Sequence, residues 1–225
     1  MDRKIYGVFV AGGSGTRMGG EVPKQFLELK GKTILQRTIE SFLEAVPQMQ
    51  VIVVLPKVHF ETWKQICANG SLSCPQILVA GGITRYQSVR NALEKVPDGA
   101  VVAIHDGVRP FASPQMLREM FAAMDEHRAL IPVLPVVDTI RSSDPSVPDP
   151  DRSKTVAVQT PQIFLSEEIK AAYSQPYELG FTDDASVAAK YGIPISMTAG
   201  ERFNIKITTP EDMVFGEAIL SFRCS

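Results

Sequence analysis

VFVAGGSGTRMGGEVPKQF, residues 8–26, is the stretch that decides the fold. The apolar run at residues 5–10 predicts a short buried strand, and it ends abruptly in a glycine-rich loop. Backbone N–H groups in such a loop can approach an anion closely, because glycine has no Cβ. Arg17 and Lys24 then supply two cations around the loop, with Pro23 stiffening the return. We therefore expect a site for a group with several negative charges, such as a triphosphate. The alternative is a tight strand-to-helix turn with solvated basic residues.

Length, net charge and cysteine content restrict the class of protein to which the chain can belong. A chain of 225 residues and 24.6 kDa is long enough to bury a full core, and we expect one domain over residues 1–225 with an appended arm. The net charge of -2 gives no general attraction to nucleic acid or to an anionic membrane. The three cysteines form no CxxC pair, and no apolar run approaches the roughly 20 residues that span a bilayer. We expect a cytoplasmic protein with reduced thiols.

Strand-length apolar runs alternate with helical patterns along the chain. The capping-box pairs Thr33 with Gln36 and Thr84 with Gln87 predict the starts of two helices. Four strands buried on both faces and separated by helices indicate a doubly wound, mostly parallel, Rossmann-like α/β sheet. The predicted strands lie at residues 5–10, 51–55, 77–80, 101–104, 129–137, 195–198 and 204–207. The predicted helices begin near residues 33, 60, 84, 114, 166, 182 and 209.

The amino-acid composition changes between residues 138 and 158. Proline, aspartate and serine crowd residues 142–153, between short β-rich segments at 139–141 and 155–158. A disordered loop is one interpretation. The flanking segments favour a protruding two-stranded arm instead.

Three of the predicted strands end in residues that can carry chemistry. The first ends in the glycine loop, and the third is followed by Gly81, Gly82, Arg85 and Ser88. The fourth is followed by Asp106 and Arg109. In an open parallel sheet, ligands bind outside the carboxyl ends of the strands, near the point where the strand order reverses. We therefore expect these three loops to meet at one site.

Two common phosphate-binding motifs are excluded by spacing. The P-loop requires Gly, four residues and then Gly-Lys-Ser/Thr, which the chain does not contain. The dinucleotide fingerprint requires glycine where Met18 stands, and the second strand ends without an acidic ribose ligand. A dehydrogenase is therefore disfavoured.

The remaining motifs resemble one enzyme family. In order, they are AGGSGTRM at 11–18, PKQF at 23–26, GGITRYQSV at 81–89, HDGVRP at 105–110, QTPQ at 159–162, TDDAS at 182–186 and NIK at 204–206. Together they resemble the 2-C-methyl-D-erythritol 4-phosphate cytidylyltransferases, a family of alditol-phosphate cytidylyltransferases of the non-mevalonate isoprenoid pathway. The resemblance runs from about residue 5 to residue 220.

This resemblance implies a reaction between CTP and an alditol phosphate, dependent on Mg²⁺ or another divalent cation, that gives a CDP-alditol and pyrophosphate. The nucleophile would already be a phosphate anion, which fits the lack of a Ser/His/Asp or Cys/His constellation. By motif position, the catalytic cations are Arg17, Lys24 and Lys206. The implied nucleotide-binding residues are Ala11, Gly12, Gly13, Ser14, Gly15, Gly81, Gly82, Arg85 and Ser88.

The resemblance also assigns the acceptor side. The implied acceptor-binding residues are Asp106, Arg109, Thr139, Arg152 and Thr182, and Asp106 is also the metal-binding carboxylate. In the family the arm crosses to a twofold-related subunit, so a homodimer is expected in which Arg152 completes the partner's site. Phe203 stands where relatives often have an acidic residue, and no second metal-binding carboxylate is assigned.

Two other functions remain open from the sequence. Ribitol-5-phosphate cytidylyltransferase would share the fold, the CTP site and the chemistry, and would differ in its acceptor. A nucleotide-binding regulator without catalysis is the alternative from another class. The joint presence of Arg17, Lys24, Asp106 and Lys206 argues against the regulator.

Overall fold

The computed structural model describes residues 3–13, 22–70 and 72–223. Eight strands form one sheet, in the order β10-β7-β9-β6-β1-β4-β5, with β8 paired to β7. The strands are β1 (Ile5–Val10), β4 (Gln50–Leu55), β5 (Gln76–Ala80), β6 (Val101–Asp106), β7 (Ala129–Pro135), β8 (Val156–Val158), β9 (Gln162–Leu165) and β10 (Ser196–Ala199). A separate two-stranded sheet joins β2 (Glu28–Leu29) to β3 (Lys32–Thr33).

Seven α-helices accompany these strands in the part of the chain that the structure describes. They are α1 (Ile34–Ala45), α2 (Phe60–Asn69), α3 (Arg85–Leu93), α4 (Pro114–Ala123), α5 (Ser166–Ala172), α6 (Asp184–Tyr191) and α7 (Pro210–Arg223). Short 3-10 turns cover Lys24–Phe26, Lys57–His59 and Arg152–Lys154. None of the helices in these ranges is long and apolar enough to cross a membrane.

The strand order confirms the predicted doubly wound, mostly parallel class. β1 pairs in parallel with β4 on one side and with β6 on the other. The chain moves outward from β1 to β4 and β5, and then returns to place β6 on the opposite side of β1. The strand order therefore reverses between β1 and β6, which is where ligands bind in sheets of this type.

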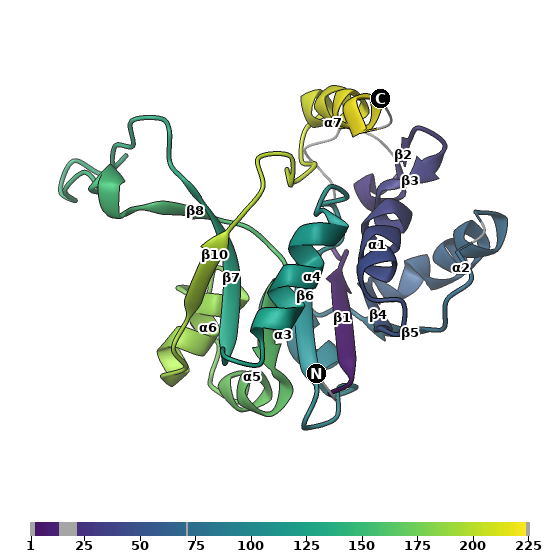
Figure 1. Cartoon of the computed structure of the whole chain (residues 1–225), viewed down its shortest axis with the longest axis horizontal. Coiled ribbons are helices and arrows are strands. Elements are labelled where there is room, and N and C mark those ends of the chain that lie inside the picture. Colours follow the sequence, from purple (N-terminus) through teal and green to yellow (C-terminus); the bar gives the residue numbers. More distant parts are fainter. Residues whose placement is uncertain (1–2, 14–21, 71, 224–225) are drawn as a thin grey trace.

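Side chains of the strands alternate between two apolar layers. Phe9 and Val53 join one core cluster with residues of α1, α2 and α4, while Val8 and Ile52 join another with residues of α3, α5 and α6. This alternation follows from the two-residue period of a strand. Figure 1 shows α1 and α4 in front of the sheet and α3, α5 and α6 behind it. Helices thus cover both faces of the sheet.

Most of the predicted helix starts are confirmed. The Thr33 side chain accepts from the Gln36 N–H, with a complete capping box at α1, and Thr84 does the same at α3. Ser113 caps α4, with proline in its first turn. These signals could be read locally because a capping residue and its backbone partner lie within one turn of each other.

Two predictions about the strands are wrong, and one strand of the main sheet, β9, was missed. Residues 204–207 form no strand, and Ile207 N–H instead donates to the Val108 carbonyl at 2.9 Å. β9 was not predicted, and it lies antiparallel between β6 and β7. In the arm, residues 139–141 are not a strand, since β8 pairs with the end of β7. Each error concerns pairing between distant segments.

The segment after β7 forms a protrusion. Figure 1 shows residues 136–155 extending away from the sheet before β8 returns to it. The Arg152 Nη1 atom donates to the Val137 carbonyl at 3.0 Å and ties the two sides of the protrusion together. Thr139 and Arg152 are both exposed there.

Candidate active site

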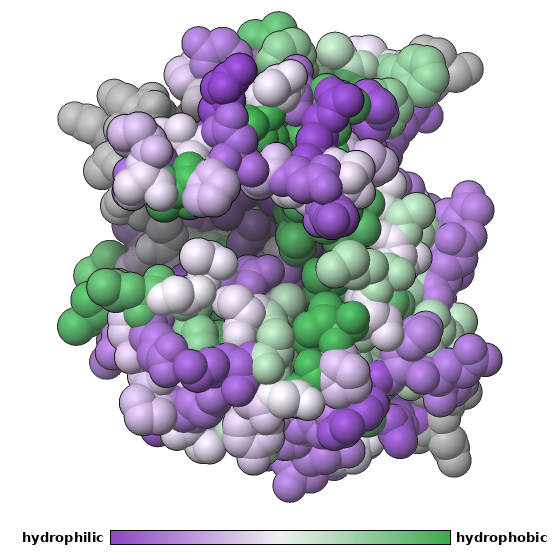
Figure 2. Space-filling view, turned by 90° about the vertical axis from the view of Figure 1, so that its left-hand side faces the viewer, coloured by the Kyte–Doolittle hydropathy of each residue, from purple (hydrophilic) through white to green (hydrophobic). Residues whose placement is uncertain are grey.

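A cavity of about 420 Å³ lies at the carboxyl ends of β1 and β6, beside the start of α3. Figure 2 shows a hollow across one face of the molecule, with hydrophilic residues deep inside it. The cavity brings together nine of the predicted residues: Ala11, Gly12, Gly13, Lys24, Gly82, Arg85, Ser88, Asp106 and Lys206. The convergence expected of the three strand ends is therefore observed. The cavity is also lined by residues that had no predicted role: Val10, Gln25, Ile83, Thr84 and Val108.

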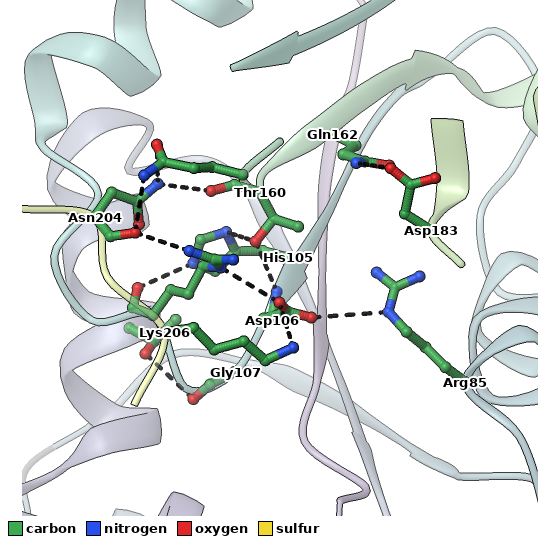
Figure 3. Close-up of polar contacts among 12 residues, drawn as sticks. Arg85, His105, Asp106, Gly107, Thr160, Gln162, Asp183, Asn204 and Lys206 are labelled. Carbon is green, nitrogen blue, oxygen red and sulfur yellow. Dashed lines mark hydrogen bonds and ion pairs between the residues drawn. The ribbon is translucent and has the colours of Figure 1, made fainter. Parts of the chain in front are cut away.

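Asp106 is the last residue of β6, and three cations surround its carboxylate. Lys206 Nζ lies 2.9 Å from Oδ2, and Arg109 Nε lies 3.3 Å from the same oxygen. Arg85 Nε lies 3.7 Å from Oδ1, on the other side of the carboxylate. Figure 3 shows Lys206 and Arg85 approaching Asp106 from different elements. The carboxylate is thus the centre of the positively charged part of the cavity.

These cations keep Asp106 ionised. Burial alone would raise the pKa of the Asp106 carboxyl, because a charge is poorly solvated in the interior. Arg85, Lys206 and Arg109 outweigh burial and hold that pKa well below its usual range. At neutral pH, Asp106 is an anion that orients cations around it.

The backbone of Asp106 is fixed by a buried hydrogen-bond network. The Asp106 N–H donates to Thr160 Oγ1 at 3.1 Å, and Thr160 Oγ1 lies 3.0 Å from His105 Nδ1. His105 Nε2 lies 3.0 Å from the Arg109 carbonyl, which can only accept, so Nε2 carries the proton. Nδ1 then accepts from the Thr160 hydroxyl. His105 is therefore a neutral, structural histidine.

Burial lowers the pKa of His105 from 6.5 to about 4, with the charges of Arg109 and Lys206 adding to the shift. We expect the free energy of unfolding to fall by about 3 kcal/mol between pH 6.5 and pH 4, because only the unfolded chain binds this proton there. Urea unfolding at several pH values measures the slope. A His105→Gln variant removes the titration and should flatten the curve in this window. Equal slopes in the two proteins would contradict the assignment.

Lys206 is held at the cavity by the segment that was expected to be a strand. Asn204 Nδ2 donates to the Thr160 carbonyl at 2.8 Å, and the Asn204 carbonyl accepts from Arg109 Nη1 at 2.8 Å. Gln159 Nε2 also donates to the carbonyls of Glu201 and Asn204. These bonds anchor the backbone two residues before Lys206, so its side chain can reach Asp106 (Figure 3). The QTPQ and NIK motifs therefore act together, although no role was predicted for their other residues.

The other wall of the cavity is the turn into α3. The Gly82 N–H donates to Ser88 Oγ at 3.0 Å, and the Ser88 hydroxyl donates to the Thr84 carbonyl. A Cβ at Gly82 would lie 2.4 Å from Gln87 Cβ, so this turn requires glycine. Gly107 is equally constrained, since a Cβ there would approach Ala11 Cβ to 2.9 Å. Close packing of the backbone thus brings these loops together.

Arg85 lines the cavity but is bound to another element. Its Nη1 and Nη2 atoms donate to the two oxygens of Asp184 at 2.8 and 2.6 Å. The Tyr173 hydroxyl donates to Asp184 Oδ1 at 2.5 Å. Burial would lower the pKa of Arg85, but Asp184 outweighs it and raises that pKa above its ordinary value. Asp184 and Tyr173 were not predicted as site residues, and the 99 positions between Arg85 and Asp184 leave no local signal.

Several predicted residues lie outside this cavity. Gly81 precedes the lining residue Gly82, and its N–H donates to the Leu55 carbonyl. Arg109 pairs with Asp106 but does not line the cavity. Thr182 is exposed before α6, and Thr139 and Arg152 lie on the protrusion. Arg152 lines a separate hollow of about 630 Å³ there. Ser14, Gly15 and Arg17 lie outside the described residues.

The described residues offer one lining carboxylate to a metal ion. Among them, no group of three or more His, Cys, Asp or Glu side chains could hold a metal. Glu201 accepts hydrogen bonds from the backbone and hydroxyl of Ser113, and Phe203 packs against Phe222. Among the lining residues in the described ranges, Asp106 alone carries a carboxylate, a ligand that Mg²⁺ commonly takes together with phosphate oxygens and water.

Comparison with known proteins adds independent information. The sequence model of the family described as 2-C-methyl-D-erythritol 4-phosphate cytidylyltransferase matches residues 5–222. Relatives with that name include a Bacteroides thetaiotaomicron protein, 42% identical over 214 residues that cover 95% of this chain and 98% of the relative. A Porphyromonas gingivalis relative is 42% identical over 224 residues, covering 98% and 100%.

A solved structure supports the same grouping. The crystal structure of 4-diphosphocytidyl-2C-methyl-D-erythritol synthase from Anaerococcus prevotii has a TM-score of 0.82 and 28% sequence identity. The match covers 97% of this chain and 96% of that one.

Proposed function

This chain belongs to the 2-C-methyl-D-erythritol 4-phosphate cytidylyltransferase family, and from this membership we propose how its cavity works. The enzyme transfers CMP from CTP to 2-C-methyl-D-erythritol 4-phosphate, giving 4-diphosphocytidyl-2-C-methyl-D-erythritol and pyrophosphate for isoprenoid precursor synthesis. The observation that carries the proposal is one cavity that combines the loop after β1, Lys24, Lys206 and Asp106.

CTP occupies the side of the cavity between the loop after β1 and the turn into α3. Gly12 and Gly13 leave room for the nucleotide, since a Cβ at Gly12 would meet no atom within 4 Å. Gly82 and Ser88 form the opposite wall, where backbone groups and a hydroxyl can select a pyrimidine. Ser14, Gly15 and Gly81 are assigned to the nucleotide on their place in the motifs.

The chemistry requires positive charge rather than a base. The acceptor phosphate is already a nucleophile, and its attack on the α-phosphorus brings two anions together. Lys24 and Lys206 line the cavity and stabilise the charge that develops on the phosphorus and on the leaving pyrophosphate. Arg17 joins them by its place in the motif. Fixed cations are effective here because they need no reorganisation during the reaction.

Magnesium belongs at Asp106. That carboxylate would hold the ion together with phosphate oxygens of the nucleotide, and the bound ion would neutralise charge on the triphosphate. Asp106 also orients Lys206, because Lys206 Nζ lies 2.9 Å from Oδ2. Arg109 shares this oxygen and keeps the carboxylate in place.

The acceptor binds on the Asp106 side, and a second copy of the chain completes its site. Thr182 lies before α6, while Thr139 and Arg152 lie on the protrusion and do not line the cavity of their own chain. We assign the last two to a partner's acceptor phosphate in a homodimer. Sedimentation showing a monomer at assay concentrations would contradict this assignment.

The test is pyrophosphate release with CTP and Mg²⁺ in the presence of each acceptor in turn. We expect turnover with 2-C-methyl-D-erythritol 4-phosphate and at least about a hundredfold lower kcat/KM with ribitol 5-phosphate, because a mispaired polar acceptor leaves buried groups unsatisfied. Preference for ribitol 5-phosphate would overturn the acceptor. Binding of CTP with no turnover on either alditol phosphate would support a regulator instead.

A further inference from the structure

Arg85 reaches the cavity from an unfavourable place for a cation. It is the first residue of α3, and the positive end of a helix dipole repels a cation there. A carboxylate that holds its guanidinium offsets this repulsion. Asp184 is that carboxylate: it is completely buried, and it binds Arg85 through two hydrogen bonds of 2.8 and 2.6 Å.

The Asp184 carboxylate is itself held by groups other than Arg85. It is the first residue of α6, where the helix dipole favours a negative charge. The Tyr173 hydroxyl donates to its Oδ1 atom, and burial together with the nearby Asp184 charge raises the pKa of Tyr173 well above its ordinary value. Tyr173 therefore stays protonated and keeps donating. The anchor of Arg85 thus has fixed partners on two sides.

The guanidinium of Arg85 lies between the carboxylates of Asp184 and Asp106. Its two terminal nitrogens donate to Asp184. Its Nε atom lies 3.7 Å from Asp106 Oδ1, and Figure 3 draws this contact as a dashed line. Lys206 and Arg109 bind the other oxygen of Asp106. Arg85 is thus the cation that contacts Oδ1 of Asp106, and without it both remaining cations would contact Oδ2.

We propose that Asp184 is a positioning residue for cytidylyl transfer, acting through Arg85 to set the orientation of Asp106. Arg85, in this view, joins two carboxylates and is not a free phosphate-binding cation, which refines the nucleotide-binding role expected from its motif. The inference rests on the proposed function. The inferred role joins residues of α3, α6 and β6, and it is separate from the roles assigned to the glycine loop and to the acceptor-binding residues.

An Asp184→Asn substitution tests this idea, with Asp183→Asn as a matched control. Asp183 is the adjacent cap of α6, and its carboxylate binds Ser186 N–H and Gln162 Nε2. Asparagine can also cap a helix, so the control keeps the helix start while changing the same functional group. We expect Asp184→Asn to lower kcat about tenfold, because misplaced reacting groups slow the chemical step. Asp183→Asn should keep kcat within about threefold of the parent.

A double-mutant cycle separates positioning from simple support of α6. If Asp184 acts through Arg85, adding Asp184→Asn to Arg85→Gln should cost no further activity, whereas independent roles give multiplied losses. The same cycle is measured on the dissociation constant of CTP, since Arg85 lines the cavity. Tyr173→Phe removes one hydrogen bond to Asp184 and leaves the buried carboxylate paired with Arg85, and it should lower kcat about threefold.

The outcomes distinguish this inference from the function. Multiplied losses in the cycle, or a kcat for Asp184→Asn equal to that of Asp183→Asn, would overturn the positioning role while leaving cytidylyl transfer intact. A parent enzyme that releases no pyrophosphate with any alditol phosphate would overturn the function, and the CTP-binding cycle would then decide the role of Asp184 alone. If Asp184→Asn fails to fold, two other variants provide the test. One is Tyr173→Phe, and the other is the double variant Arg85→Gln with Asp184→Asn, which removes both charges of the buried pair.

Discussion

Replacing Lys206 by methionine is expected to lower kcat by about a hundredfold to a thousandfold, as when one fixed charge-stabilising donor is removed from an active site. The side chain is 40% exposed, and its ammonium lies 2.9 Å from Asp106 Oδ2 at the cavity wall. Methionine keeps most of the length of the side chain and removes only its charge. Arg109 and Arg85 still pair with Asp106, so the fold should persist. Steady-state kinetics at saturating CTP and acceptor measure the loss.

Lys32→Met is the matched control for this variant. Lys32 is 44% exposed and forms an ion pair of 2.8 Å with Glu40, so its exposure and pairing resemble those of Lys206. It does not line the cavity. A surface pair of this kind contributes little to stability. Equal kinetic losses in the two variants, or a kcat for Lys206→Met within about threefold of the parent, would remove Lys206 from the catalytic set.

Replacing Lys24 by alanine is expected to lower kcat by about a hundredfold or more. Lys24 begins the 3-10 turn Lys24–Phe26 and lines the cavity beside the loop after β1. The turn is fixed by its neighbour Phe26, whose ring stacks on Trp63 with centroids 6.1 Å apart. The backbone at Lys24 should therefore keep its place when the side chain is shortened, and the loss should fall on the chemical step.

Lys57→Ala provides the control for Lys24→Ala. Lys57 also follows a proline and also begins a three-residue 3-10 turn, Lys57–His59, but it does not line the cavity. Both substitutions remove a lysine from the same local structure. Circular dichroism and thermal unfolding should give similar values for the two variants. If kcat falls equally in both, or in neither, the role assigned to Lys24 is wrong.

Local signals in the sequence predicted much of the fold and of the site. The apolar run at β1 predicted a buried strand, and the glycines after it predicted a binding loop at the carboxyl edge of a parallel sheet. Capping pairs such as Thr33 with Gln36 fixed helix starts, because both partners lie within one turn. Asp106 and Lys24 were expected at the site, and both line the cavity.

The parts that could not be predicted depend on contacts between distant segments. β9 has only four residues, and its antiparallel place between β6 and β7 follows from pairing and not from its composition. Residues 204–207 were predicted to form a strand, but they form no ladder. The Asn204 carbonyl accepts from Arg109 and the Asn204 side chain donates to the Thr160 carbonyl, while the Ile207 N–H donates to the Val108 carbonyl. Arg85 was expected to bind nucleotide from its place in the GGITRYQSV motif, and its partner Asp184 is 99 positions away.

Phosphorus NMR of the complete reaction tests the central claim most directly. The enzyme is incubated with CTP, Mg²⁺ and 2-C-methyl-D-erythritol 4-phosphate, and the phosphorus signals are followed over time. The account predicts that the signals of CTP and the phosphomonoester disappear together, while a CDP-alditol diphosphate and pyrophosphate appear in equal amounts. Loss of CTP to CDP and inorganic phosphate, or no change in the phosphomonoester signal, would contradict it.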